Sequence, residues 1–319
     1  MEQLEVLTDD PAVLIDDSGS ITAVGRRTEL QVPEGCLVEE VEGVLFPGFV
    51  DSHTHSVFGA ARTADHERRA RGVSYKDIAA AGGGILSSVR SVRGMSQEDL
   101  RVRTESRLRR LLSLGTTTVE VKSGYGLDLS AELKQLQVID GLKESGPSLI
   151  PTFLGAHEVP EEYRPRSDDY VDLVVNEMIP AVRDGRLARF CDVFCEPGVF
   201  SVDQSRVVLR AALAVGMGIK LHADELDGSG GAELGAELGA TSVDHLAAIS
   251  PEGISALVAS DTVAVMLPGT MMFLGRREQA PAREIVDRGG AVALATDFNP
   301  GSSPGLSLPL MATMAVSQL

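Results

Sequence analysis

From about residue 44 onward, short apolar runs alternate with longer stretches in which apolar residues recur every three or four positions. The first pattern is typical of buried strands and the second of amphipathic helices. We predict strands at 44–51, 116–121, 148–154, 191–195, 218–222, 242–246, 262–267 and 291–296. We predict helices at 75–81, 96–114, 130–144, 168–182, 203–215, 231–239, 251–259 and 282–288, with Ser130 as the N-cap of the third.

Eight strands, each followed by a helical pattern, predict an α/β fold in the form of a closed (β/α)8 barrel. Residues 1–43 have a different pattern of short strands and turns. Within them, residues 12–25 predict a hairpin whose turn is residues 17–20. We therefore expect a small β domain that begins in residues 1–43 and a barrel in residues 44–319.

Histidines occupy a recurring place in this pattern. Five of the six fall at or just beyond the end of an apolar run, and an aspartate follows the last predicted strand. In a barrel of this kind the C-terminal strand ends meet at one face, where catalytic groups lie. His53-Thr54-His55 alone also fits a hydrogen-bonded pair at a strand end. The whole set predicts a shared site, and its members are His53, His55, His157, His222, His245 and Asp297.

Three imidazoles and a carboxylate are ligands that suit zinc or iron, with a position left open for water. Such an ion lowers the pKa of the water from about 15.7 toward about 7. Glu225 lies three residues after His222 and could act as a proton shuttle to that water. Its alternative interpretation is a solvated loop carboxylate.

Composition limits the classes of partner. The net charge of −17 argues against nucleic acid or an anionic membrane surface. Three cysteines do not indicate a disulfide framework, and we interpret Cys191 and Cys195 as buried core thiols. The sequence shows neither a signal peptide nor an apolar run of membrane-spanning length. We therefore expect a cytoplasmic protein.

The ligand pattern, together with residues 47–51, resembles the amidohydrolase superfamily, whose members are metal-dependent hydrolases on a (β/α)8 barrel beside a small β-sandwich. Four longer segments narrow this resemblance to the imidazolonepropionase family of histidine degradation: residues 120–127, 152–157, 192–196 and 295–302. The resemblance implies hydrolysis of a small molecule, 4-imidazolone-5-propanoate, to N-formimidoyl-L-glutamate. It also implies one zinc or iron ion per chain and a homodimer.

The resemblance also implies site residues. The metal ligands are His53, His55, His222 and Asp297. The residues around the substrate are Arg62, Tyr75, Tyr125, His157, Glu225, Asn299, Gly301 and Ser302. For the mechanism, we expect the catalytic residues to be Glu225, His245 and Asp297, with His245 helping to stabilise the oxyanion and Glu225 or Asp297 moving the proton. Arg62 offers a forked pair of donors for the propanoate carboxylate.

One departure from the family is the short stretch after Asp297. We expect residues 307–319 to begin a last barrel helix, with the remaining helix and the C-terminal strands of the small domain lacking, and low stability if these residues are the whole protein. Two alternatives stay open. One is another mononuclear amidohydrolase, such as a cytosine- or guanine-type deaminase, and the other is an inactive metal-binding scaffold or fragment.

Overall fold

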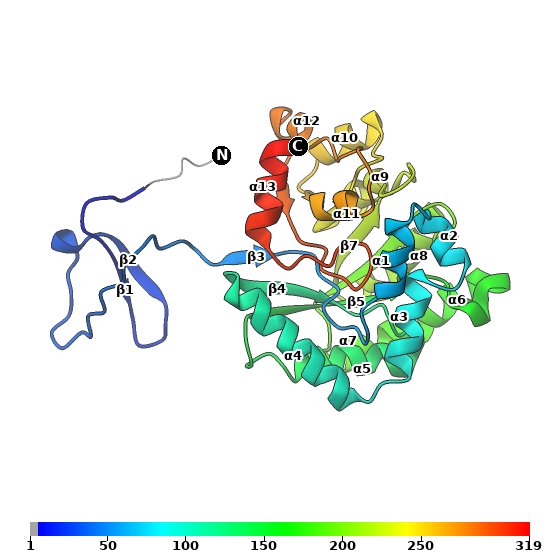
Figure 1. Cartoon of the computed structure of the whole chain (residues 1–319), viewed down its shortest axis with the longest axis horizontal. Helices are drawn as coiled ribbons and strands as arrows, with labels where there is room; N and C mark the ends of the chain where they lie inside the picture. Colours follow the sequence, from blue (N-terminus) through cyan, green and yellow to red (C-terminus); the bar gives the residue numbers. More distant parts are fainter. Residues whose placement is uncertain (1–5) are drawn as a thin grey trace. The chain divides into compact units, whose positions relative to one another are not determined.

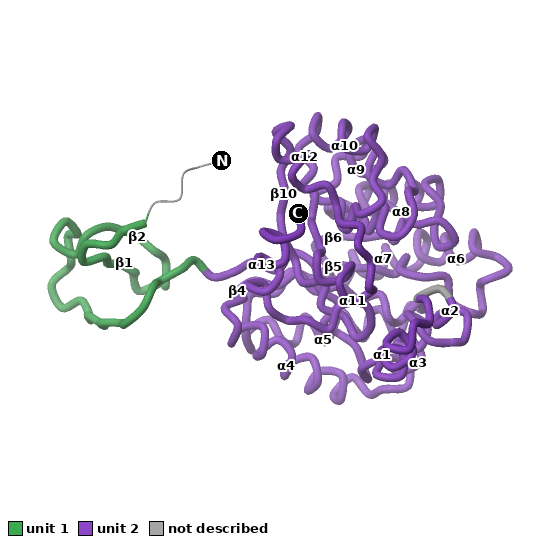
Figure 2. The backbone as a smooth tube through the Cα atoms, turned by 45° about the horizontal axis from the view of Figure 1, so that its top comes forward, with its two compact units in different colours: residues 1–47 green, residues 48–319 purple. Residues whose placement is uncertain are grey.

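The structure of the chain is a computed structural model. It describes residues 6–319, apart from the side chains of residues 75 and 76. The chain divides into two compact units, Met1–Pro47 and Gly48–Leu319, which are coloured separately in Figure 2. That the first unit is the start of a small β domain stays a prediction.

The first unit contains the predicted hairpin. Strands β1 (Pro11–Ile15) and β2 (Ile21–Arg26) pair antiparallel. The turn between them forms around the side chain of Asp16, which accepts the backbone N–H groups of Ser18 and Ser20 at 2.9 and 3.0 Å. Gly19 has φ +83°, a conformation that favours glycine. The prediction for residues 12–25 is confirmed.

The second unit contains a sheet of eight parallel strands in the order in which they occur along the chain (Figure 1). This confirms the predicted (β/α)8 barrel. The strands are β3 (Phe49–Asp51), β4 (Thr116–Lys122), β5 (Ser148–Ala156), β6 (Phe190–Cys195), β7 (Gly218–Ala223), β8 (Ser242–His245), β9 (Val263–Met266) and β10 (Val292–Leu294).

The seam between the first strand, β3, and the last strand, β10, is closed by hydrogen bonds between the residues that follow these two strands. The His55 N–H donates to the Phe298 carbonyl at 2.9 Å, and the Asp297 N–H donates to the His53 carbonyl at 3.0 Å. On the same seam, the Asp51 carboxylate accepts both the backbone N–H and the hydroxyl of Thr296, at 3.0 and 2.6 Å. The segment after β3 and the segment after β10 are therefore held together just where the predicted ligands lie.

Helices follow the strands and cover the outside of the barrel (Figure 1). They are α1 (Thr63–Ala70), α2 (Tyr75–Ala80), α3 (Gly84–Arg93), α4 (Gln97–Ser113), α5 (Leu129–Asp140), α6 (Ser167–Leu173), α7 (Ile179–Asp184), α8 (Val202–Ala214), α9 (Gly231–Leu238), α10 (Pro251–Val258), α11 (Pro268–Phe273), α12 (Ala282–Asp287) and α13 (Leu308–Gln318). Between α6 and α7 the chain makes a π-helical turn, Val174–Met178, so the helix predicted at 168–182 continues through that turn.

Three details of the prediction were wrong. The residues of the apolar run at 44–46 are exposed and have no regular structure, and of β3 only Asp51 is buried. An apolar run next to Pro and Gly looks the same in a buried strand and in a segment that leads into one, and Pro47 has no N–H for a ladder. The polar stretch after His55 contains α1 and α3, which the pattern did not indicate. The N-cap of α5 is Asp128, not Ser130.

The core of the second unit is formed by apolar side chains between the sheet and the helices. Cys191 and Cys195 belong to it and are buried and free, as predicted. The remaining interior of the barrel is polar, because histidines, carboxylates and two lysines point inward from the strands. Buried polar groups of this kind need partners, and these partners determine the site.

Candidate metal centre and active site

One pocket lies at the C-terminal ends of the barrel strands. It brings together most of the predicted site residues, together with two apolar ones that were not predicted, Ile85 and Phe194. The lining residues are His55, Arg62, Ile85, Tyr125, His157, Phe194, His222, Glu225, His245, Asp297, Asn299 and Ser302. His53 lies directly behind His55, and Gly301 contacts Arg62. Tyr75 begins α2, but its side chain lies outside the described residues.

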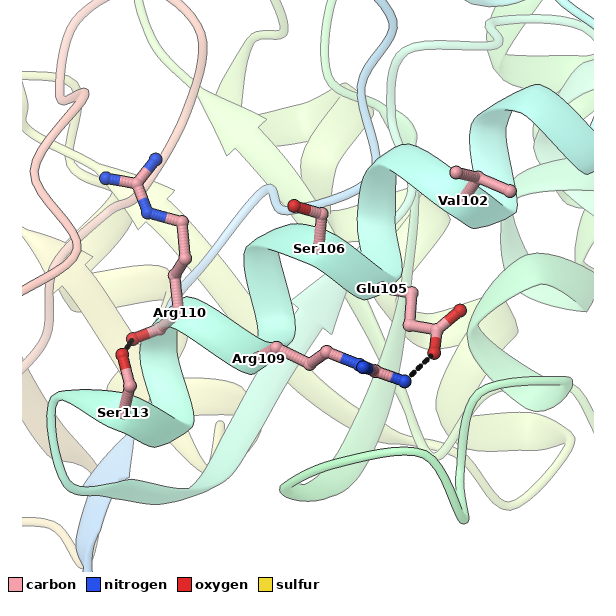
Figure 3. A pocket seen from close by; sticks show the side chains of 6 residues that line it. All are labelled: Val102, Glu105, Ser106, Arg109, Arg110 and Ser113. Atoms are coloured by element: carbon pink, nitrogen blue, oxygen red, sulfur yellow. Dashed lines mark hydrogen bonds and ion pairs between the residues drawn. The ribbon is translucent and has the colours of Figure 1, made fainter.

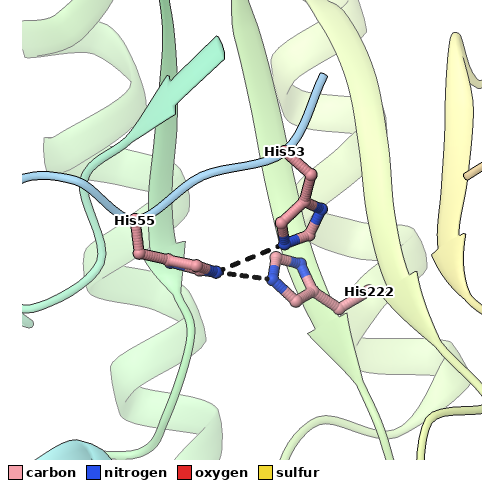
Figure 4. A group of neighbouring side chains, drawn as sticks. All are labelled: His53, His55 and His222. Carbon is pink, nitrogen blue, oxygen red and sulfur yellow. Dashed lines mark hydrogen bonds between the residues drawn. The ribbon is translucent and has the colours of Figure 1, made fainter. Parts of the chain in front are cut away.

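Three histidines point their Nε2 atoms at one another (Figure 4). His53 and His55 come from the segment after β3, and His222 comes from β7. The Nε2 atom of His55 lies 3.3 Å from that of His53 and 3.2 Å from that of His222. All three side chains are buried. The i, i+2 spacing of an extended segment places His53 and His55 on the same face, as the sequence indicated.

The other ring nitrogens fix the tautomers of two of these histidines. The Nδ1 atom of His53 lies 2.6 Å from Asp244 Oδ2, and the Nδ1 atom of His222 lies 3.0 Å from Asp192 Oδ1. A carboxylate accepts, so each Nδ1 carries the proton and each Nε2 presents a bare lone pair to the cluster. Burial holds the pKa of His53 and of His55 well below the ordinary value. The Nε2 lone pairs of His53 and His222 both face Nε2 of His55, so the cluster can hold a cation once Nε2 of His55 is unprotonated.

Asp297 adds an oxygen to this cluster. Its Oδ1 atom lies 3.5 Å from Nε2 of His53 and 3.5 Å from Nε2 of His55, while its Oδ2 accepts the hydroxyl of Thr270 at 2.6 Å. Burial raises the pKa of Asp297 to about 6, and the Thr270 hydrogen bond partly opposes this. Donor atoms bound to one ion at about 2.1 Å lie roughly 3 to 3.5 Å apart. The donor set and its spacing therefore suit a single metal ion.

His245 and Glu225 form the neighbouring wall of the pocket. The Nε2 atom of His245 lies 3.8 Å from Oε2 of Glu225, and neither ring nitrogen of His245 has a hydrogen-bond partner among the described residues. Burial, followed by the charges of Asp297 and Glu196, raises the pKa of Glu225 well above its ordinary value. A buried carboxyl with a raised pKa suits proton transfer.

Glu196, at the end of β6, fixes the loop that carries Glu225. Its carboxylate accepts the backbone N–H groups of Glu225, Leu226 and Asp227 at 3.2, 3.1 and 2.7 Å. Asp224 has φ +52° and accepts N–H groups of the next turn, including that of Ser229 at 2.6 Å. The backbone around Glu225 is therefore held from both sides, which fixes the direction of its side chain.

Arg62 supplies a cation at another wall of the pocket. Its side chain is buried, and its Nε and Nη1 atoms have no hydrogen-bond partner among the described residues. The backbone of Gly301 lies so close that a Cβ there would come within 1.5 Å of Arg62 Nη2. The absence of a side chain at 301 thus makes room for the guanidinium. Buried N–H groups without partners are what a carboxylate ligand would satisfy.

Tyr125 and His157 lie beside His55. The ring of His157 stacks on that of His55 with centroids 5.0 Å apart, and the Tyr125 ring is 5.3 Å from that of His157. The Nδ1 atom of His157 lies 2.9 Å from the carbonyl oxygen of Gly124, so Nδ1 carries the proton and Nε2 is an acceptor. Burial lowers the pKa of His157 to about 3, which keeps the ring neutral at physiological pH.

The side-chain amide of Asn299, which lines the pocket, makes hydrogen bonds within its own turn. Its Oδ1 atom accepts the N–H groups of Gly301 and Ser302 at 2.8 and 2.7 Å, and its Nδ2 atom donates to the Asp297 carbonyl at 2.7 Å. Both ends of the amide are therefore used within the turn. Asn299 borders the pocket and shapes the segment that carries Asp297, Gly301 and Ser302.

Comparison with known proteins places this chain in a family. A model described as the amidohydrolase family matches residues 44–318. The chain belongs to the amidohydrolase family. Among curated relatives, the imidazolonepropionase of Clostridium tetani is 46% identical over 99% of this chain and 74% of its own length. That of Symbiobacterium thermophilum is 48% identical over 94% of this chain and 72% of its own length.

Solved structures of other proteins support the fold of this amidohydrolase. A 5-methylcytosine deaminase from Klebsiella pneumoniae superposes with a TM-score of 0.71 at 16% identity, covering 96% of this chain and 77% of that one. A guanine deaminase from C. acetobutylicum gives 0.70 at 15% identity, covering 97% and 74%. At this identity the likeness concerns the fold alone. In the described part of the chain, no helix is both long and apolar enough to cross a membrane.

The sequence did not reveal the residues that support the amidohydrolase cluster from behind. Asp192 and Asp244 lie next to the motifs that were recognised, and their alternation with buried apolar residues would have indicated inward-facing carboxylates. Thr270 follows β9 in a segment with no strand or helix pattern, and no signal in the sequence indicated its role. Ile85 and Phe194 look like ordinary core residues.

A second hollow lies along the outer face of α4, apart from the cluster (Figure 3). A single helix lines it, through Val102, Glu105, Ser106, Arg109, Arg110 and Ser113. Arg109 is paired with Glu105 there. Groups from different elements do not converge on this hollow, in contrast to the histidine pocket, so it does not provide a candidate site.

Proposed function

We propose that this amidohydrolase hydrolyses 4-imidazolone-5-propanoate to N-formimidoyl-L-glutamate, as an imidazolonepropionase. The observation that carries the proposal is that one pocket joins a buried cluster of metal-ligand type to a buried arginine, Arg62. Among the described residues, its Nε and Nη1 atoms have no hydrogen-bond partner and its only ion pair is a 4.0 Å contact with Asp65. The reaction needs both features, because the substrate has a ring amide to be opened and a propanoate carboxylate to be held. The similarity to imidazolonepropionases over almost all of this chain supports the same activity.

We propose that His53, His55, His222 and Asp297 hold one ion, either zinc or iron. When bound, the ion would polarise the ring carbonyl and lower the pKa of a water in the site. Asp297 presents Oδ1 to the cluster while Thr270 holds Oδ2. The Nε2 lone pairs of His53 and His222 are already directed inward, so these two ligands need little reorganisation on binding.

Proton transfer in this proposal belongs to Glu225. Its carboxyl accepts no hydrogen bond among the described residues and lies beside His245, whereas both oxygens of Asp297 are engaged. Glu225 takes a proton from the attacking water and delivers it to the ring nitrogen as the C–N bond breaks. His245 supplies a ring N–H for the negative charge that develops on the carbonyl oxygen.

Substrate binding in this proposal involves Arg62 and His157, which line the same pocket. Arg62 holds the propanoate carboxylate through two of its N–H groups, and His157 Nε2 accepts a hydrogen bond from a ring N–H. Tyr125, Gly301 and Ser302 border the same space. Tyr75, the cytoplasmic location and the homodimer stay predictions.

The test is hydrolysis of freshly generated 4-imidazolone-5-propanoate, followed by the loss of its ultraviolet absorbance and by identification of the product, with metal analysis of the same sample. We expect turnover with about one zinc or iron per chain. Cytosine and guanine serve as comparison substrates, because the barrel superposes on deaminases of such rings. Turnover of either base, without turnover of the imidazolone, would reject the proposal.

A further inference from the structure

Behind the histidine cluster lies a second layer of charged side chains inside the barrel. Asp192 and Asp244 accept the Nδ1–H groups of His222 and His53, and each carboxylate has one further oxygen. In Asp244 that oxygen accepts the hydroxyl of Ser242 at 2.6 Å. In Asp192 it is bound by a lysine. The orientation of the two histidines therefore depends on what holds these two carboxylates.

Lys122, the last residue of β4, is the group that links them. Its Nζ atom lies 2.7 Å from Asp192 Oδ2, 2.8 Å from Glu120 Oε1 and 3.9 Å from Asp244 Oδ2. The side chain is fully buried, with 0% exposure. Burial by itself would lower the pKa of Lys122, but Asp192 and Glu120 raise the pKa above its ordinary value. Lys122 is therefore a charged ammonium.

Lys220, on β7, has a different set of partners. It donates to the Ser52 carbonyl at 2.6 Å and lies 3.5 Å from Asp244 and 3.7 Å from Glu120. It makes no ion pair with Asp192 among the described residues. The chain has only five lysines against 24 arginines, and two of the five lie in this interior. A compact ammonium fits between several carboxylates where a planar guanidinium does not.

We propose that Lys122 is a positioning residue for the metal cluster: by holding Asp192, and with it the Nδ1–H of His222, it fixes the direction of the His222 lone pair. Its longer contact with Asp244 extends the same restraint to His53. Lys122 touches neither the ion nor the substrate in this role. The inference rests on the proposed metal site but not on the identity of the substrate.

The competing explanation is that Lys122 only neutralises buried carboxylates and so maintains the fold. The two explanations differ in what is lost when the ammonium is removed. If the ion pair is purely structural, its loss would lower the stability but leave the geometry of the histidine cluster and its affinity for the ion unchanged. A positioning residue would change the affinity for the ion and the ligand field around it, because outer partners of ligating histidines typically alter affinity by about 10–100-fold.

The test compares Lys122→Met and Lys122→Gln with wild type and with a matched control, Lys134→Met. Lys134 also donates to enclosed acceptors, the carbonyls of Val92 and Met95 at 2.8 and 2.9 Å, but pairs with no carboxylate of the cluster. Zinc affinity is measured by competition with a chromophoric chelator. The visible absorption spectrum of the cobalt-substituted protein reports the ligand field, and urea unfolding of the metal-free protein reports the stability.

We expect the zinc dissociation constant of Lys122→Met to rise by about 10–100-fold, with an altered cobalt spectrum. Lys122→Gln keeps an N–H donor toward Asp192 and should fall between Lys122→Met and wild type. Lys134→Met should lose stability without a change in affinity or spectrum. If Lys122→Met does not fold, the zinc affinity and the cobalt spectrum of Lys122→Gln decide between the two explanations. A folded Lys122 variant with wild-type affinity and spectrum overturns the role of Lys122, whereas a wild type that binds neither zinc nor iron overturns the metal site itself.

Discussion

The position of the proton on each imidazole determines what the cluster can bind. Asp244 and Asp192 keep the protons of His53 and His222 on Nδ1, so that both Nε2 lone pairs face inward. If either ring carried its proton on Nε2, an N–H group would point at the place of the ion. The carboxylates therefore select the tautomer that binds metal, before any metal is present.

Glu225→Gln tests the proposed proton transfer. We expect kcat to fall by roughly 10²–10⁴-fold, because the glutamine amide has the same shape but cannot take up and release a proton as the carboxylate does. The metal content should stay at the wild-type value. Steady-state kinetics and metal analysis check this. Glu158→Gln is a matched control, since Glu158 is partly buried and accepts the Val159 N–H at 2.9 Å but does not line the pocket. Turnover of Glu225→Gln close to that of wild type would contradict the assignment.

Arg62→Lys tests the carboxylate contact. A lysine keeps the charge but loses the fork of two N–H donors, so KM should rise by roughly tenfold or more, with metal affinity unchanged. Arg71→Lys, at the exposed end of α1, should leave KM as it is. Initial rates over a range of substrate concentrations distinguish the two, and an unchanged KM for Arg62→Lys would remove Arg62 from the substrate site.

The histidines and Asp297 could be recognised in the sequence because they follow apolar runs, and parallel strands bring such positions together. Which carboxylate faces which ring could not be predicted. The contact of His53 with Asp244 joins residues 191 positions apart and depends on the registers of all the strands between β3 and β8. A shift of one residue would turn Asp244 to the other face of the sheet.

Elements were predicted best where the period was unbroken. The patterns of β4 to β10 matched, because each is a short apolar run with a helix after it. α1 was missed because Thr63–Ala70 is so polar that its only buried residue is Asp65, so no apolar stripe marks it. Asp128 and Ser130 are both residue types that cap helices, and only the backbone decides between them.

The N-cap of α5 can be tested by substitution. The Asp128 side chain accepts the Ala131 N–H at 2.8 Å, whereas Ser130 lies inside the helix and is exposed. We expect Asp128→Ala to lower the free energy of unfolding by about 1–2 kcal/mol and Ser130→Ala to change it by less than about 0.5 kcal/mol. Urea unfolding measures both. The reverse order would mean that α5 begins at Ser130.

For the whole molecule, the ion should contribute to stability, because the cluster exists only in the folded chain. Zinc at about 100 times its dissociation constant would add roughly 2.7 kcal/mol to the free energy of unfolding. We expect a chelator to lower Tm and added zinc to restore it. His222→Gln should lose this response, whereas His66→Gln, outside the cluster, should keep it. An identical response of the two variants would argue against His222 as a ligand.

The ion would also link the first and last strands of the barrel. His53 and His55 follow the first strand, β3, and Asp297 follows the last strand, β10. An ion bound by all three would therefore link the two edges of the sheet. Transient separation of the edges would then require ligand dissociation as well as the breaking of the hydrogen bonds that cross the seam, among them those of the His55 and Asp297 amides. The exchange of these two amide hydrogens with solvent should accordingly slow when the ion binds, so that occupancy of the centre sets how often the barrel opens.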